Sequence, residues 1–188
     1  MVSLQKLDAY TLLYKEQLYR LYHQQLYMQN IDIAENVQWL KAALKADFAN
    51  PLNALARVKD KRDWEKYRDL FMMHLNLKMV ECYLQWATRY NKQEAYFFNA
   101  PWQALNLESL DKAESLFRYA LVYWAEAKSW SSKLAPFKWL HLPEVQEWED
   151  EQYRIENSEL DYQTIIERHL AKLAEVRQTF KNMDASTY

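Results

Sequence analysis

The side chains best suited to chemistry in this sequence are its four histidines, and their spacing argues against a catalytic or metal site. His23, His74, His141 and His169 lie in four different segments, and none has an HxxxH or ExxH partner. A di-iron helical bundle needs two Glu-x-x-His motifs and two further carboxylates. Glu167 and His169 are only two residues apart, so they point to different faces of a helix. We therefore expect no catalytic residue, no metal and no cofactor.

The single cysteine, Cys82, does not change this expectation. It has no second cysteine with which to form an intramolecular disulfide. It lies among apolar neighbours, where a buried small hydrophobic residue is the expected role, and a catalytic thiol is the less favoured alternative.

The chain contains no glycine in 188 residues. Glycine supplies backbone conformations with positive φ and allows the main chain to approach a phosphate closely. Its absence excludes the GxGxxG dinucleotide loop, the GxxxxGK[ST] phosphate loop and the GxSxG nucleophile elbow. A non-catalytic protein is therefore favoured over an enzyme.

One polar stripe could still line a ligand site. His74 and Glu81 are seven residues apart on one helical face, with Lys78 between them. A solvent-facing strip is the favoured interpretation. The alternative is a helical bundle that binds a small apolar or aromatic ligand between its helices. Its lining would comprise Met72, Met73, Met79 and Trp86 together with His74, Lys78 and Glu81.

The region from 144 to 161 is strongly acidic, with eight carboxylates against Arg154. Some of these charges favour helix N-termini through the helix dipole, which we expect for Glu144, Glu159 and Asp161. The run of Glu147, Glu149, Asp150 and Glu151 could instead steer a basic partner. Both interpretations of that run stay open.

Aromatic residues are the other functional signal, since the chain has 8 Trp, 14 Tyr and 7 Phe. Trp102, Trp130, Trp139 and Trp148 fall in or beside predicted connections and helix ends. Each one alone is explained by filling gaps between helices. Because Trp and Tyr are enriched at binding hot spots, we expect at least one of the four to contact a partner.

These residues must be positioned by helices. Apolar residues recur at helical spacing, which predicts an all-α fold with five to six main helices packed as antiparallel hairpins in a single domain, residues 1–188. Asp32 and Asn50-Pro51 are helix-start signals, and Ser158 with Asp161 resembles a capping box. The alternating charges of 57–69 predict a solvated helix face. The helices are expected near residues 4–28, 33–48, 52–58, 64–90, 109–134, 145–155 and 162–180, with the longest loop at 99–102.

Ala113-x3-Phe117-x2-Ala120 resembles the second helix of a tetratricopeptide unit, in which small and large residues alternate so that antiparallel helices stack. The resemblance covers one helix and implies a short array of stacked helical hairpins that binds proteins. In its general composition the chain also resembles small helical accessory proteins of bacterial envelope and motor assemblies.

The function predicted is therefore a non-catalytic protein-interaction or scaffold subunit of a larger assembly. A formal net charge of −2 offers no positive field for nucleic acid, so the expected partners are proteins or a second copy of the chain. The longest apolar stretch is interrupted by polar residues, which argues against a membrane span, and the N-terminus lacks a signal-peptide pattern. A cytoplasmic location is the resulting expectation.

Overall fold

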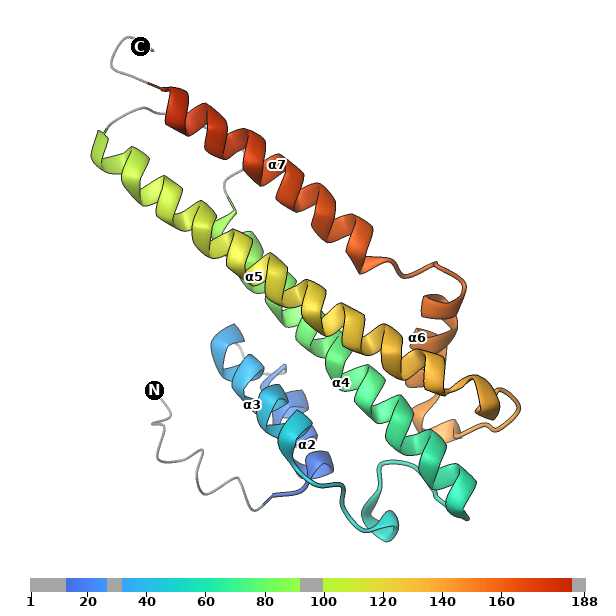
Figure 1. Cartoon of the computed structure of the whole chain (residues 1–188). Coiled ribbons are helices and arrows are strands. Elements are labelled where there is room, and N and C mark those ends of the chain that lie inside the picture. The colour runs from blue at the N-terminus through green and yellow to red at the C-terminus, as the bar shows by residue number, and fades with distance from the viewer. Residues whose placement is uncertain (1–12, 27–31, 92–99, 184–188) are drawn as a thin grey trace. The chain divides into compact units, whose positions relative to one another are not determined.

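The computed structural model describes residues 13–26, 32–91 and 100–183, and its described part is all-α (Figure 1). Six α-helices are present there and no strand is assigned, which confirms the predicted fold class. Their bounds are α2 Lys15–Gln25, α3 Ile33–Lys45, α4 Lys61–Tyr90, α5 Ala100–Lys133, α6 Gln146–Glu156 and α7 Tyr162–Asn182. Three 3₁₀ turns connect them: η1 Pro51–Asn53, η2 Ala135–Phe137 and η3 Pro143–Val145.

The chain divides into two compact units. Unit 1 comprises Met1–Met79 and Ala125–Leu160, and unit 2 comprises Val80–Trp124 and Asp161–Tyr188. The prediction of one domain over residues 1–188 stays a prediction.

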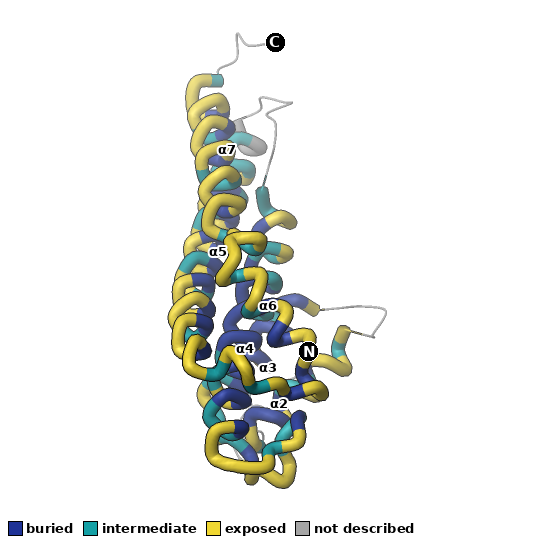
Figure 2. The backbone as a smooth tube through the Cα atoms, turned by 90° about the vertical axis from the view of Figure 1, so that its right-hand side faces the viewer, coloured by how far each residue is buried: buried dark blue, intermediate teal, exposed yellow. Residues whose placement is uncertain are grey.

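In unit 1, α2 and α3 pack as a hairpin, and α2 also packs along the first half of α4. Lys15 reaches the C-terminal end of α3, while Gln25 at the other end of α2 bonds Glu35 in the first turn of α3, so the two helices are antiparallel. The α2 hydroxyl of Tyr19 contacts His74 of α4. From residue 70 to residue 79, α4 is almost entirely buried, which Figure 2 shows as dark blue, and only Met72 and Lys78 are partly exposed there.

In unit 2, α5 lies antiparallel to both the second half of α4 and to α7. Tyr83 of α4 stacks on Tyr119 and Tyr123 of α5, and Ser109 near the start of α5 bonds the carbonyl of Tyr90 at the end of α4. Towards α7, paired contacts run in opposite directions along the two helices: Gln103 with Phe180, Asp111 with Arg177, Phe117 with His169 and Trp124 with Tyr162. Buried positions on α7 form a stripe at helical spacing, namely Ile166, Leu173, Val176 and Phe180.

Two predicted helix starts are confirmed. The Asp32 carboxylate accepts hydrogen bonds from the backbone N–H groups of Ala34 and Glu35, so it caps α3. The Asn50 side chain accepts from Leu52 N–H, and Pro51 opens η1. Both are the expected N-cap geometry, because a side-chain oxygen satisfies an otherwise unpaired N–H group.

Three predicted elements were wrong in extent. Within the described part of the predicted helix over 4–28, the helix begins only at Lys15, since Tyr14 is extended and Lys15 N–H bonds Asp47 O at 2.8 Å. The helix over 52–58 stops after η1, because Ala54 is extended and Leu55 N–H bonds the Tyr67 hydroxyl at 3.1 Å. Residues 100–102 do not form a loop: α5 begins at Ala100 and includes Pro101, which the first turn of a helix tolerates.

The end of α6 shows how a helix terminates here without glycine. Ser158 is the one described residue with positive φ, at 56°, and the carbonyl of Arg154 accepts from both Glu159 and Leu160 N–H. The predicted capping role of Ser158 is therefore wrong. The N-cap of α7 is Asp161, whose side chain accepts from Thr164 N–H. A left-handed residue at a helix C-terminus is usually glycine, so this serine carries backbone strain.

Candidate functional site

The first half of α4 carries charged and polar side chains into the interior of unit 1. Lys66 and His74 are 3% and 0% exposed, and both find acidic partners on α6. Buried charges persist only when they are paired and hydrogen-bonded, so the geometry of these two pairs determines what the unit can do.

The Lys66 ammonium group donates to the Glu149 carboxylate and to the carbonyl of Leu140. Glu149 in turn accepts from Leu142 N–H at 3.0 Å, and its other oxygen lies 3.3 Å from Nδ1 of His141. The pair is 4% and 8% exposed at its two side chains. It therefore holds the connection between α5 and α6 at three consecutive residues.

The residue just before these anchors is Trp139, which is 88% exposed. Pro136 and Pro143 lie on either side of it and restrict φ within η2 and η3. The backbone around Trp139 is therefore anchored, while its indole is exposed to solvent. We call residues 137–142 the Trp139 loop.

A second polar chain runs from α6 through α4 to α2. The Glu151 carboxylate lies 2.5 Å from Nδ1 of His74 and 3.2 Å from the Lys78 ammonium. On the other side of the imidazole, Nε2 lies 2.8 Å from the Tyr19 hydroxyl. When the imidazole is neutral, a carboxylate acceptor at Nδ1 places the proton there, so Tyr19 donates to Nε2.

The electrostatics of this chain favour an ionised Glu151 and a neutral Tyr19. Burial alone would raise the pKa of Glu151, but the hydrogen bond from His74 and the charges of His74 and Lys78 outweigh it, and the pKa is lowered. Burial raises the pKa of Tyr19 to about 12; Lys78 opposes this rise, while Glu147 and Glu151 add to it. The Tyr19 hydroxyl therefore stays protonated at neutral pH.

Trp148 lies against this chain, and the same face of unit 1 is hollowed. Its indole stacks on Phe71 and on His74 and meets Tyr19 edge-on. Beside it is a pocket of about 420 Å³ within unit 1. Its walls include Tyr19, Arg20, Leu55, Glu144, Glu147 and Trp148.

A third polar cluster joins α2 to α3 and α4. Lys15 donates to the carbonyls of Ala43 and Leu44, and burial lowers the pKa of Lys15 to about 8, although Glu16 and Asp47 oppose this shift. The Glu16 carboxylate accepts from Ala49 N–H at 2.8 Å and from the Tyr67 hydroxyl at 3.0 Å.

The four tryptophans proposed as partner contacts have different surroundings. Trp139 is exposed, whereas Trp148 is 4% exposed and belongs to the interior of unit 1. Trp130 is partly buried, and the Lys133 ammonium lies 3.3 Å from the centroid of its ring. Trp102 falls in the first turn of α5, and its side chain lies outside the described residues.

The acidic run is divided in the same way. Glu147 and Asp150 are exposed, but Glu149 and Glu151 are each 8% exposed; Glu149 pairs with Lys66, and Glu151 with His74 and Lys78, inside unit 1. Of the four candidates for steering a basic partner, Glu147 and Asp150 are therefore at the surface and Glu149 and Glu151 are not. Glu147 and Glu149 also lie in the first turn of α6, where the helix dipole favours a negative charge.

The predicted polar stripe also differs from a solvent-facing strip. His74 and Met73 are fully buried, while Lys78 and Glu81 are partly buried. His74, Met73 and Lys78 belong to unit 1, and Glu81 and Trp86 to unit 2. None of the seven alternative lining residues, Met72 and Met79 included, forms a wall of the pocket beside Trp148.

Sequence reasoning missed Lys66 and Tyr19. Lys66 was assigned to a solvated face with Asp63, and both are buried. A signal was present: Lys66, Leu70 and His74 recur at intervals of four, so they share the face that Leu70 identifies as apolar.

Two other kinds of site are absent from the part of the chain that the structure describes. In 13–26, 32–91 and 100–183, no three His, Cys, Asp or Glu side chains gather as metal ligands would. Over the same residues, no helix combines the length and apolarity that crossing a bilayer requires.

Fold and site together define an all-α protein of antiparallel helices with ion pairs buried in one of its two units. The chain belongs to the family described as Domain of unknown function (DUF8513), which matches residues 62–183. The match begins in the first turn of α4 and ends just after α7, so it includes the Trp139 loop and its anchors, whereas α2 and α3 precede it. No curated protein and no solved structure matches the chain.

Proposed function

We propose that this chain is a non-catalytic protein-interaction subunit that docks through the Trp139 loop. The observation that carries the proposal is an indole, 88% exposed, on a backbone anchored by the buried Lys66–Glu149 pair. Exposing a tryptophan to water is unfavourable, and burying its large area in a partner costs little conformational entropy when the backbone is already fixed.

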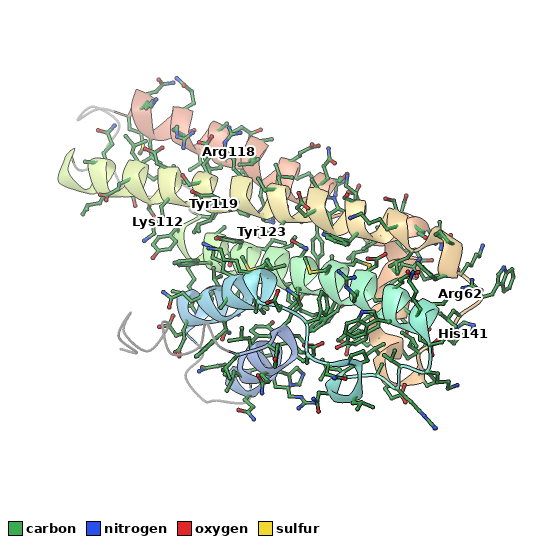
Figure 3. All side chains as sticks on the ribbon, turned by 60° about the horizontal axis from the view of Figure 1, so that its bottom comes forward. Arg62, Lys112, Arg118, Tyr119, Tyr123 and His141 are labelled. Carbon is green, nitrogen blue, oxygen red and sulfur yellow. The ribbon has the colours of Figure 1, made fainter. Side chains whose placement is uncertain are left out.

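The charges beside the loop indicate the partner's surface. Lys138 precedes Trp139 and is exposed, and Figure 3 places Arg62 and His141 at the same end of α4. We therefore propose a partner protein with an apolar pocket for the indole and acidic residues around it. Complementary charge of this kind raises the association rate and selects the partner.

The test is a comparison of binding by matched variants of the whole chain. Trp139→Ala is expected to lose a partner that the unchanged chain retains from a lysate of its source cells, and that partner is then purified for titration. Leu52→Ala is the control, because Leu52 is also a large apolar side chain of unit 1 and is 92% exposed. Equal affinity of the purified partner for the Trp139→Ala variant and the unchanged chain would refute the proposal.

A second copy of this chain is the alternative partner, and sedimentation velocity separates the two cases. A dimer that dissociates on Trp139→Ala would place the loop in a homo-oligomer. The likeness to tetratricopeptide hairpins, membership of an envelope or motor assembly, and the cytoplasmic location stay predictions. So does the alternative of an apolar ligand bound between the helices.

A further inference from the structure

The pocket beside Trp148 has walls of three chemical kinds, all within unit 1. Its volume of about 420 Å³ lies within the range of small-molecule sites. Apolar surface comes from Leu55 and the aromatic residues, whereas charge comes from Arg20 on α2, Glu144 in η3 and Glu147 on α6. Both signs of charge are therefore present around one apolar centre.

The aromatic wall is held in place from behind. The Tyr19 hydroxyl is bonded to His74, which is bonded to the buried Glu151, and the Trp148 indole packs against the same imidazole. Side chains that are fixed by buried partners lose little freedom when a ligand binds. This wall is thus ordered before any ligand arrives.

The carboxylate side of the pocket favours a cation. Glu147 lies close enough to Tyr19 for its charge to help raise the pKa of the phenol. An ammonium group beside Glu144 and Glu147 would pair with their carboxylates, and Tyr19 and Trp148 line the same pocket. Arg20, in contrast, offers a planar pair of donors suited to a carboxylate.

We propose that this pocket binds a small zwitterion of the amino-acid type, with an apolar side chain between its charged ends. The ammonium group lies towards Glu144 and Glu147, and the carboxylate is bound by Arg20. The apolar side chain packs on Leu55, Tyr19 and Trp148. This site is independent of docking through the Trp139 loop.

Three probes that share one side chain test the charge requirement: leucine, isopentylamine, which lacks the carboxylate, and 4-methylpentanoate, which lacks the ammonium group. Titration calorimetry with the whole chain at neutral pH and low salt is expected to give leucine the highest affinity. Each truncated probe should bind about tenfold more weakly, as loss of one charged hydrogen-bonding group implies.

Matched variants locate the site. Glu147→Gln is expected to weaken leucine about tenfold, and Arg20→Gln should abolish the preference for leucine over isopentylamine. Glu159→Gln removes the same charge from an exposed residue outside the pocket and should leave leucine binding within about twofold. Leucine that does not bind the unchanged chain, or 4-methylpentanoate that binds as tightly as leucine, would overturn the proposal. So would equal weakening by Glu147→Gln and Glu159→Gln.

Discussion

The His74 imidazole lies nearly parallel to the Trp148 indole, with ring centroids 4.9 Å apart and 22° between the planes. One turn earlier on α4, Phe71 stacks on the same indole at 4.8 Å and 12°. Trp148 thus covers a full turn of α4 and links α6 to it. This relationship explains why Trp148, one of the four candidate partner contacts, fills space between helices instead.

Trp148→Ala is expected to destabilise unit 1 by about 3–5 kcal/mol, because it removes a large buried ring and leaves a cavity beside His74. Trp148→Phe should lose less, since a ring remains between α4 and α6. Urea unfolding followed by circular dichroism measures both. Trp139→Ala serves as the exposed control, with a change within about 0.5 kcal/mol; similar losses at positions 139 and 148 would contradict the assignment.

Lys66→Met is expected to cost about 3–5 kcal/mol, because Glu149 would remain buried without its cation. The double variant Lys66→Met/Glu149→Leu should recover part of this loss, since both charges are then absent. The recovery is incomplete because Leu142 N–H loses its acceptor. Unfolding free energies of the two single variants and the double variant complete the cycle, and additive losses would show that the pair is not coupled.

The lowered pKa of Lys15 predicts that the folded chain becomes more stable at alkaline pH. Its pKa is about 8 in the folded chain, where burial disfavours the charge, and 10.5 as the ordinary value. Between these values the unfolded chain binds more protons, so the free energy of unfolding increases as pH rises from about 8 to 10. The neutral amine keeps two N–H donors for the carbonyls of Ala43 and Leu44.

Chemical denaturation at several pH values tests this slope against Lys15→Met, in which the titration is absent. The difference in unfolding free energy between the unchanged chain and the variant should change in favour of the unchanged chain as pH rises. A difference that is constant between pH 8 and 10 would show that Lys15 keeps its ordinary pKa when folded.

Ser158→Gly is expected to stabilise the chain by roughly 0.5–1 kcal/mol, because glycine adopts positive φ without the steric cost of a Cβ atom. Thermal unfolding measures the gain. Ser129→Gly, in the exposed interior of α5, should instead destabilise by a similar amount through lost helix propensity. Effects of the same sign at the two serines would refute the conformational explanation.

The fold class was predictable because helical periodicity is a local property of the sequence. The apolar spacing along α4 and the capping signals at Asp32 and Asn50 each depend only on residues that are close in the sequence. The start of α5 was missed for a local reason too: Pro101 was interpreted as part of a loop, although proline is common in the first helical turn.

The candidate site was only partly predictable. The Trp139 position could be proposed from an aromatic residue in a predicted connection, whereas the residues that anchor it could not. Lys66 and Glu149 are 83 residues apart, and His74 and Glu151 are 77 apart. Nothing in a single sequence pairs such residues, and a charge run looks the same whether its members face water or an ion partner.

The anchored backbone around Trp139 has a consequence for proteolysis. Lys138 is exposed and followed by a tryptophan, so trypsin would ordinarily cleave this connection first. A protease binds its substrate as an extended strand, and the bonds of Leu140 and Leu142 to Lys66 and Glu149 oppose that extension. We therefore expect this surface connection, although it contains a cleavage site, to resist digestion until the ion pair beneath it opens.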